Sequence, residues 1–352
     1  MVIDSFSNFA SYKPRENDGS RSTNRLLMQV SFAFLKIMDL YNKHDFIIVM
    51  DCIDDVAVLN TSSELPNLTT YQLKTKDNGL GDFPIKALAN DQVFLKIYDH
   101  IEQIEGTVKE IYLITNIPLK LKKKIAKEEY IKFNNLDTEM QEIIKENMSK
   151  SKLFKKHGLS EKFVYSIVNM SVTSHREIVE SKFMQFLIDR KIDMHITATN
   201  ATCVTVLDIL TKKQAKEFSK KDSMPLLIEK KGFSKKDFDK LLSDTESLET
   251  IDYQDIKDKY FPEMNLFKEL KYSEALANMK SKCIEYPKIL EEDHEKVTKF
   301  IIDKISKVTD RKQLITLMKE ELFLELTTEL SEIEKEVFCM NKIEYFLKKG
   351  GK

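Results

Sequence analysis

Hydrophobic positions change their spacing several times along the first 120 residues. Between residues 26 and 41 they recur every three or four positions, which predicts a helix with one apolar face. A continuous β-branched run at 46–50 predicts a strand that is covered on both faces. We further expect strands at 56–59, 69–75 and 110–115, a helix at 91–104, and a loop or arm at 11–25. The order helix, three strands, helix, strand predicts an α/β arrangement with a mixed sheet.

From residue 120 onward the pattern is mostly helical. Residues 120–150 are very charged, 177–190 are amphipathic, and the β-branched stretch 202–206 fits either a strand or a buried helix turn. The strongest helical patterns lie at 294–308 and 312–348, and the second contains several leucines. We therefore expect an α/β domain at about 1–150 and a mainly helical region at about 151–352.

The composition narrows the class of protein. Hydrophobic residues make up 42% and charged residues 32% of the 352 positions, which is typical of a soluble, helix-rich globular protein. Lysine and arginine (56) nearly balance aspartate and glutamate (57), so a nucleic-acid partner would need a local basic groove. The four cysteines are far apart and form no CxxC pair, which argues against a zinc site or a disulfide framework. We find no signal peptide, P-loop or membrane-length apolar stretch, and expect a cytoplasmic protein without membrane contact.

Three carboxylates at a strand junction carry the candidate chemistry. Asp51, Asp54 and Asp55 lie between the strands at 46–50 and 56–59, and Gln72 and Lys74 follow on the next strand. Gln72 and Lys74 are two residues apart, so they point to the same face of that strand. Carboxylate and amide oxygens are ligands for Mg²⁺, and a lysine beside an attacking water helps it to lose its proton. This set suits hydrolysis of a phosphodiester. A bulge would decide which of Asp54 and Asp55 faces the metal, and Asp54 is slightly favoured because it shares a face with Val56 and Val58 if the strand starts early.

Simpler interpretations of the same residues stay open. Aspartates favour solvated turns, and Lys74 is also what an ordinary edge strand would carry. Gln29, on the first helix, has either a structural role or a role in orienting Lys74 or a carboxylate. The basic runs at 120–127 and 149–156 are either solvated helix faces or contacts to DNA phosphates. Our candidates for DNA binding are Lys76, Lys122, Lys123 and Lys124.

The acidic junction followed by a Gln-x-Lys strand, after an N-terminal helix, resembles the PD-(D/E)xK superfamily of restriction-endonuclease-like nucleases. Over about residues 15–120, the order of the Gly19 loop, the helix with Gln29, the acidic cluster, residues 71–75 and the strand ending at Asn116 is similar to one group within it. That group is the double-stranded-DNA endonuclease effector of bacterial anti-phage defence, found in CBASS, in Lamassu and beside HerA-type ATPases. The chain departs from the group in having Asp51 where glutamate is usual, and Leu26-Leu27-Met28 where Gly-aromatic-aromatic is usual.

The resemblance implies a restriction-endonuclease-like core and a Mg²⁺- or Mn²⁺-dependent endonuclease that cleaves double-stranded DNA. It also implies a sensing partner, either an SMC-type ATPase complex or a HerA-like ATPase, and we expect a homo-oligomer when the enzyme is active. The leucine-rich final helices are the expected docking or self-association surface. The alternative from another class is a non-catalytic helical adaptor or DNA-binding subunit on a degenerate nuclease core. The implied metal ligands are Asp51, Asp54, Asp55 and Gln72, and the implied catalytic residues are Asp54, Asp55, Gln72 and Lys74.

Overall fold

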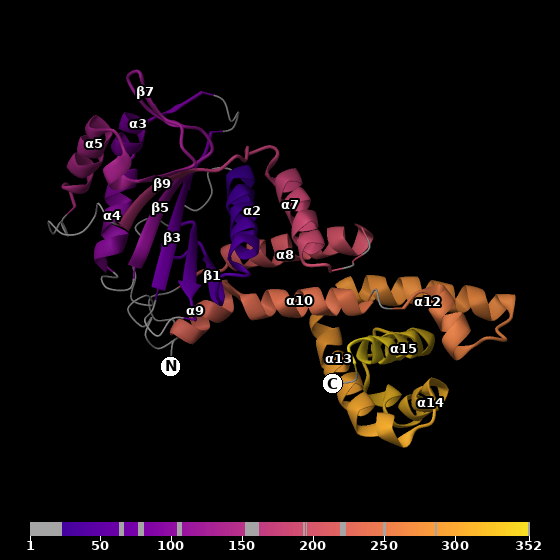
Figure 1. Cartoon of the computed structure of the whole chain (residues 1–352). Coiled ribbons are helices and arrows are strands. Elements are labelled where there is room, and N and C mark those ends of the chain that lie inside the picture. The colour runs from indigo at the N-terminus through magenta and orange to yellow at the C-terminus, as the bar shows by residue number, and fades with distance from the viewer. Residues whose placement is uncertain are drawn as a thin grey trace. The chain divides into compact units, whose positions relative to one another are not determined.

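The first part of the described chain is built around a mixed seven-stranded sheet (Figure 1). Its strand order is β10-β1-β2-β3-β5-β9-β8. The central strands β1 (Phe46–Met50), β2 (Val56–Asn60) and β3 (Asn67–Lys74) pair antiparallel. The next strands, β5 (Val108–Thr115) and β9 (Phe163–Ile167), run parallel to β3. The short edge strands β10 (Gly232–Ser234) and β8 (Tyr130–Lys132) pair antiparallel with β1 and β9. The predicted mixed sheet is confirmed.

This computed structural model describes residues 23–62, 67–76, 81–103, 108–151, 162–192, 194, 196–218, 223–248, 251–285 and 287–350. The predicted elements of the first 120 residues agree with it to within a few residues at their ends. Most of the expected arm at 11–25, with Gly19, lies outside the described residues. Among these residues, no helix is both long and apolar enough to cross a membrane.

Helices cover both faces of the sheet (Figure 1). One face packs against α3 (Ile85–Asn90), α4 (Val93–Gln103) and α5 (Thr138–Met148), with Leu59, Leu113 and Phe163 in the shared core. The other face packs against α2 (Thr23–Leu40), where Phe32 meets the ring of Tyr71 edge-on at 5.3 Å between centroids. The helix α7 (His175–Asp189) joins α2 through ring contacts such as that of Phe34 with Phe183.

The expectation of mostly helical structure after residue 120 is wrong for the segment that follows β5. There β6 (Leu119–Leu121) and β7 (Lys124–Ala126) form a hairpin that pairs with β4 (Phe83–Pro84) in a small second sheet. Leu119 and Leu121 are buried, and Lys122 turns the chain in the left-handed region (φ 57°). The many charges of this segment hid a strand in which only alternate residues are apolar.

The described residues divide into two compact units, and the first takes its parts from both sides of the expected boundary near residue 150. It comprises Met1–Asp189 and Val206–Asp239, and the second unit comprises Arg190–Thr205 and Lys240–Lys352. The first unit extends beyond residue 150 because β9 and β10 are strands of its sheet. Sheet pairing over such sequence distances leaves no local pattern in the chain.

The later part of the chain is helical, as predicted. The stretch 202–206, which fitted two interpretations, is part of a helix. The bounds are α8 (Ile196–Gln214), α9 (Met224–Lys231), α10 (Lys235–Leu248), α11 (Tyr253–Asp255), a π-helical turn (Ile256–Tyr260), α12 (Leu266–Glu285), α13 (Pro287–Lys304), α14 (Arg311–Glu321) and α15 (Glu332–Lys348).

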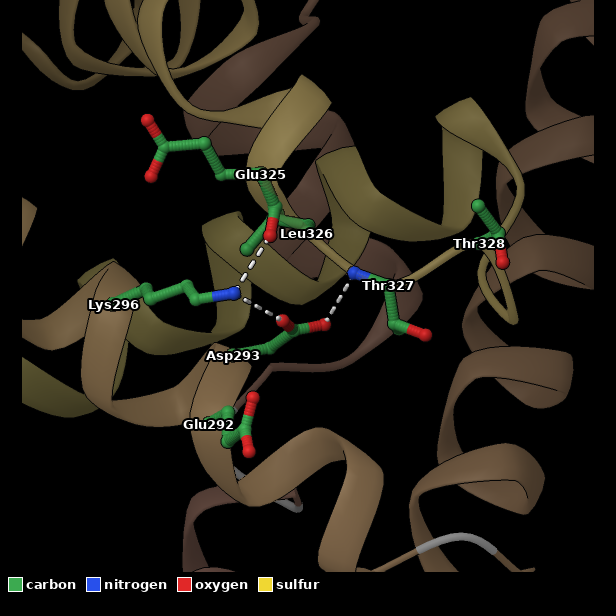
Figure 2. Close-up of a pocket in the computed structure, with 7 residues that line it drawn as sticks. All are labelled: Glu292, Asp293, Lys296, Glu325, Leu326, Thr327 and Thr328. Carbon is green, nitrogen blue, oxygen red and sulfur yellow. Dashed lines mark hydrogen bonds and ion pairs between the residues drawn. The ribbon is translucent and has the colours of Figure 1, made fainter.

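The single long helix predicted at 312–348 is wrong, because the chain breaks between α14 and α15. Figure 2 shows how α13 holds this break: Asp293 accepts a hydrogen bond from Thr327 N–H (2.9 Å), and Lys296 donates to the carbonyl of Glu325 (2.7 Å). Ser331 and Glu334 then start α15 with a capping box. These contacts come from another helix, so the helical periodicity of 312–348 did not reveal them.

Most leucines of the final helices lie in the core of the second unit. Leu314, Leu322 and Leu330 are buried in its core, whereas Leu324 is 97% exposed. The expectation that these leucines form a docking surface is therefore wrong for most of them. Large exposed apolar side chains lie instead on α12, at Leu266, Phe267 and Leu270.

Candidate active site

The five residues 51–55 form the tip of the β1–β2 hairpin. Met50 pairs with Val56, and the N–H of Asp51 donates to the carbonyl of Asp55 at 3.0 Å. Asp51 adopts φ 44°, a left-handed conformation that aspartate tolerates better than most residues. Because Val56 also lies opposite Tyr71 of β3, the hairpin tip is placed beside the carboxyl end of β3. This is the end that contains Gln72 and Lys74.

Asp55 is the carboxylate that the structure brings to the Gln-x-Lys strand. Its Oδ2 accepts hydrogen bonds from Gln72 Nε2 and from the N–H of Leu73, both at 2.6 Å. Continuing the register by one residue from the Val56–Tyr71 pair places Asp55 opposite Gln72. Strand register therefore places Asp55 opposite Gln72 and in contact with it, whereas the sequence slightly favoured Asp54; which of the two faces a metal stays a prediction.

Burial dominates the electrostatics of Asp55. It raises the pKa of this carboxyl to about 7, while the ammonium of Lys74 and the hydrogen bond from Leu73 oppose the rise. The neighbouring carboxylates of Asp54 and Asp51 add to it. The charged form of Asp55 is therefore less stable in the folded protein than in water, and a bound cation would favour it.

Asp54 and Asp51 lie differently from Asp55. Asp54 is buried, whereas the side chain of Asp51 is 56% exposed. Within the described part of the chain, no three His, Cys, Asp or Glu side chains are grouped so that they could hold a metal ion. A metal site at this tip would therefore also use other oxygen donors, such as the amide of Gln72, backbone carbonyls or the substrate's phosphate.

A buried lysine, which the sequence interpretation missed, supports the hairpin tip. Lys231, the last residue of α9, donates to the carbonyl of Asp51 at 2.7 Å, and its Nζ lies 3.8 Å from Asp51 Oδ2. Burial lowers the pKa of Lys231, and the nearby carboxylate of Asp51 opposes this. No sequence signal could have linked residues 180 positions apart, because Lys231 follows Lys230 in an ordinary basic helix end.

Gln29 lies on α2 and contacts another amide. Its Oε1 accepts a hydrogen bond from Nε2 of Gln214 in α8 at 2.7 Å. Gln214 in turn offers its main-chain carbonyl to Lys231 at 3.4 Å. The predicted role of Gln29 in orienting Lys74 or a carboxylate stays a prediction; the structure connects it toward Asp51 through Gln214 and Lys231.

Lys76 is held at the end of β3. Its main-chain N–H and carbonyl bond to the side chain of Asn116 at 2.9 and 2.8 Å, and its Nζ donates to the carbonyl of Asp82 at 2.8 Å. The ammonium also lies 5.2 Å from the ring centroid of Phe83. Its predicted contact with DNA remains untested, and in this conformation Lys76 ties together the segments that follow β3 and β5.

The other predicted DNA-binding lysines lie on the β6–β7 hairpin. Lys122 forms an ion pair with Glu139 (2.9 Å) and Lys124 with Asp137 (2.8 Å), both at the start of α5. Lys123 is exposed between them. The pairs leave less free charge for phosphates than the sequence suggests, so Lys123 is the better candidate for a DNA contact, which stays a prediction.

Comparison with known proteins gives three results. Residues 17–214 match the family described as Cap4, dsDNA endonuclease domain. The chain is 44% identical over 356 aligned positions to the Lamassu protein LmuA of Bacillus cereus (strain VD014), a match that covers 99% of this chain and 100% of that protein. Among solved structures, it is similar to Acinetobacter baumannii Cap4, a SAVED/CARF-domain-containing receptor with the cyclic trinucleotide 2'3'3'-cAAA. That match has 10% identity and a TM-score of 0.39 and covers 68% of this chain and 48% of that one.

Proposed function

The chain belongs to the Cap4 dsDNA endonuclease domain family, and from this membership we propose that it is a metal-dependent DNA endonuclease, the effector of an anti-phage defence system of the Lamassu type. The identity to LmuA over nearly the whole length of both proteins supports the defence role. The order of α2, the β1–β2 hairpin, the Gln-x-Lys strand β3 and the parallel strand β5 supports a restriction-endonuclease-like core.

One contact carries the proposal. The carboxylate of Asp55 meets Gln72 Nε2 and Leu73 N–H, and Lys74 lies close enough to lower the pKa of Asp55. Acid, amide and ammonium groups therefore gather at the carboxyl end of β3, in a chain whose family cleaves double-stranded DNA. These are the residue types that phosphodiester hydrolysis needs at one place.

The oxygen donors at the tip fit Mg²⁺ or Mn²⁺. Both ions prefer carboxylate, carbonyl and water oxygens, and Mg²⁺ is commonly held by one or two carboxylates together with substrate phosphates. Asp55 would hold the ion, with the amide oxygen of Gln72 and either Asp54 or Asp51 completing the protein's share. When bound, the ion supplies Lewis-acid stabilisation of the phosphoryl oxygens. Because burial of the carboxyl group raises the pKa of Asp55, a bound cation would favour the charged form that holds it.

Lys74 has the second role. It lies two residues beyond Gln72 on the same strand face, so its ammonium is directed to the side on which Asp55 sits. There it would orient the attacking water and stabilise the negative charge that develops as the water oxygen bonds to phosphorus. The attacking water would release a proton to solvent as it bonds to phosphorus. The P–O bond to the leaving oxygen would then break, and that oxygen would take up a proton from solvent.

The test is cleavage of supercoiled plasmid by the full chain, purified with the products of its neighbouring genes, in Mg²⁺, in Mn²⁺ and in EDTA. We expect nicked and linear DNA with either metal and intact plasmid in EDTA. Lys74→Ala should lower the rate by at least about 100-fold, since it removes a group that acts only in the transition state. Lys43→Ala is the matched control, because Lys43 is exposed just before β1, at the strand end opposite the tip.

Three results would contradict the proposal or a part of it. Cleavage by Lys74→Ala at the rate of the unmodified protein would remove Lys74 from the mechanism. Intact plasmid in every metal, with the partner present, would favour the alternative of a DNA-binding adaptor on a degenerate nuclease core. Cleavage that persists in EDTA would exclude the metal.

We assign the partner contact to the helical unit. Leu266, Phe267 and Leu270 on α12 are 71%, 68% and 62% exposed, and clustered exposed side chains of this size mark contact sites more often than free surface. The similarity to a Lamassu protein favours an SMC-type ATPase complex as the occupant. A HerA-like ATPase and a homo-oligomeric active form stay predictions, and sedimentation of the purified chain with and without its partner tests the latter.

A further inference from the structure

A lysine inside the first unit lies where the hairpin tip meets two helices. Lys231 is 2% exposed. Among the described residues, its ammonium lies near the carbonyl of Asp51 at 2.7 Å, the carbonyl of Gln214 at 3.4 Å and Asp51 Oδ2 at 3.8 Å. Burying an ammonium is costly unless its hydrogen bonds are satisfied. The burial of this ammonium therefore depends on its contacts with Asp51 and Gln214.

The surroundings fix where this ammonium lies. Gln214 is itself held by its side-chain bond to Gln29, so α2, α8 and the end of α9 converge on one point. The next residue, Gly232, allows the chain to pass directly from α9 into β10. A Cβ at Gly232 would lie 2.6 Å from the carbonyl oxygen of Ile228, closer than real Cβ atoms come to backbone. Glycine at 232 thus permits the close turn that brings Lys231 under the tip.

The contact reaches Asp55 through the backbone of the tip. Lys231 binds the carbonyl of Asp51, and the N–H of Asp51 donates to the carbonyl of Asp55. Asp51 is held in a left-handed conformation (φ 44°) that carries a strain cost for a non-glycine residue. Such a conformation persists when surrounding contacts hold it, and Lys231 supplies one of them.

We propose that Lys231 is a positioning residue for the active site: by anchoring the Asp51 carbonyl it holds the hairpin tip in the conformation in which the Asp55 carboxylate meets Gln72. The expected effect of Lys231 on cleavage rests on the proposed endonuclease function. Its expected effect on the conformation of the hairpin tip does not. Lys231 acts through the tip and need not touch DNA or metal. Lys231 affects cleavage through the position of the Asp55 carboxylate, since a displacement of catalytic groups by about 1 Å greatly lowers the reaction rate.

Hydrogen–deuterium exchange of the full chain, in EDTA, tests the structural part. In Lys231→Met, which keeps an unbranched side chain up to Cε and removes the ammonium, amides in residues 51–56 should exchange about 10- to 100-fold faster, as expected on losing one charge-assisted hydrogen bond. Strand β5 should exchange as before. Lys216→Met is the matched control, because Lys216 is an exposed lysine just after α8, and its exchange should equal that of the unmodified protein. Unchanged exchange at 51–56 in Lys231→Met would overturn the proposal.

Steady-state cleavage of plasmid tests the catalytic part. Lys231→Met should lower kcat by about 100-fold and leave KM for DNA unchanged, because positioning of the tip affects the chemical step and not DNA binding. Cleavage at the unmodified rate would also overturn it. If no form of the protein cleaves DNA, the endonuclease proposal fails, and exchange still decides the role of Lys231.

A second variant, Gln214→Met, tests the proposal if Lys231→Met does not fold. Gln214→Met removes the link to Gln29 but keeps the carbonyl that Lys231 binds, so it should speed exchange at 51–56 by a smaller factor than Lys231→Met. Gln214→Met with the exchange of the unmodified protein would mean that the tip is not held through this network, which counts against the proposal.

Discussion

Replacing Asp55 by asparagine should make the metal-free protein more stable while it destroys cleavage. Asparagine has the shape of the neutral acid and can accept hydrogen bonds from Gln72 and Leu73 through its one amide oxygen. It removes the negative charge that burial makes costly. The substitution therefore separates what Asp55 does for the fold from what it does for the reaction.

The pKa of Asp55 sets the size of the effect. Burial raises it from 3.8 to about 7. At about 1.4 kcal/mol per pKa unit, the ionised carboxylate costs the metal-free fold about 4 kcal/mol at pH 8. The amide NH₂ of asparagine brings a donor that needs a partner, at a cost of about 1–3 kcal/mol. The net gain should be about 1–3 kcal/mol, which raises Tm by roughly 2–10 °C for a unit of this size.

The sign of the pH dependence follows from the same shift. Between pH 3.8 and about 7, the folded chain keeps a proton on Asp55 that the unfolded chain has lost. The contribution of Asp55 to stability therefore falls as pH rises through this window. The advantage of Asp55→Asn should be largest at pH 8 and should turn into a disadvantage of about 1–3 kcal/mol as the pH falls to about 4, where only the cost of the amide donor remains.

The assay is thermal unfolding in EDTA at several pH values, followed by plasmid cleavage in Mg²⁺. Asp45→Asn is the matched control, because Asp45 lies at the other end of β1. Its side chain is 68% exposed and forms a surface ion pair with Lys235. This substitution should change neither Tm nor cleavage. A Tm for Asp55→Asn below that of the unmodified protein at pH 8 would refute the argument from burial, and full cleavage would remove Asp55 from the site.

Three further predictions concern the rest of the molecule. Gly232→Ala should destabilise the first unit by about 1–3 kcal/mol, measured by urea unfolding, because its Cβ would overlap the carbonyl of Ile228; an unchanged midpoint would contradict this. Burial lowers the pKa of His294 to about 2, so the unfolded chain gains a proton below about pH 6.5 that the folded chain does not, and stability should fall with decreasing pH by up to about 1.4 kcal/mol per unit. His294→Leu should remove that slope in urea unfolding, and a persisting slope would assign it to other groups. Phe267→Asp on α12 should reduce co-purification with the partner without changing Tm, whereas Lys299→Asp, exposed on α13, should not.

Local pattern was sufficient where one periodicity dominated the chain. The strand at 46–50 and the helix α2 were predictable because a buried strand and an amphipathic helix each place apolar residues at a characteristic spacing. The common direction of Gln72 and Lys74 followed from the alternation of side chains along a strand. Strands β6, β7 and β8 were missed because each is only three residues long and lies among charged residues, which is too short for an alternating apolar pattern to show.

The amino-acid sequence by itself determined the class of the protein, its mixed sheet and the strand that carries Gln72 and Lys74. Only the tertiary structure decided that Asp55 lies opposite Gln72 and contacts it, because this depends on how β2 pairs with β3. It also placed Lys231 beneath the tip and turned most leucines of the final helices inward. The physical reason is the same in each case: periodicity reports which face of an element is apolar, whereas pairing partners and buried charges are set by contacts between segments that lie far apart in the chain.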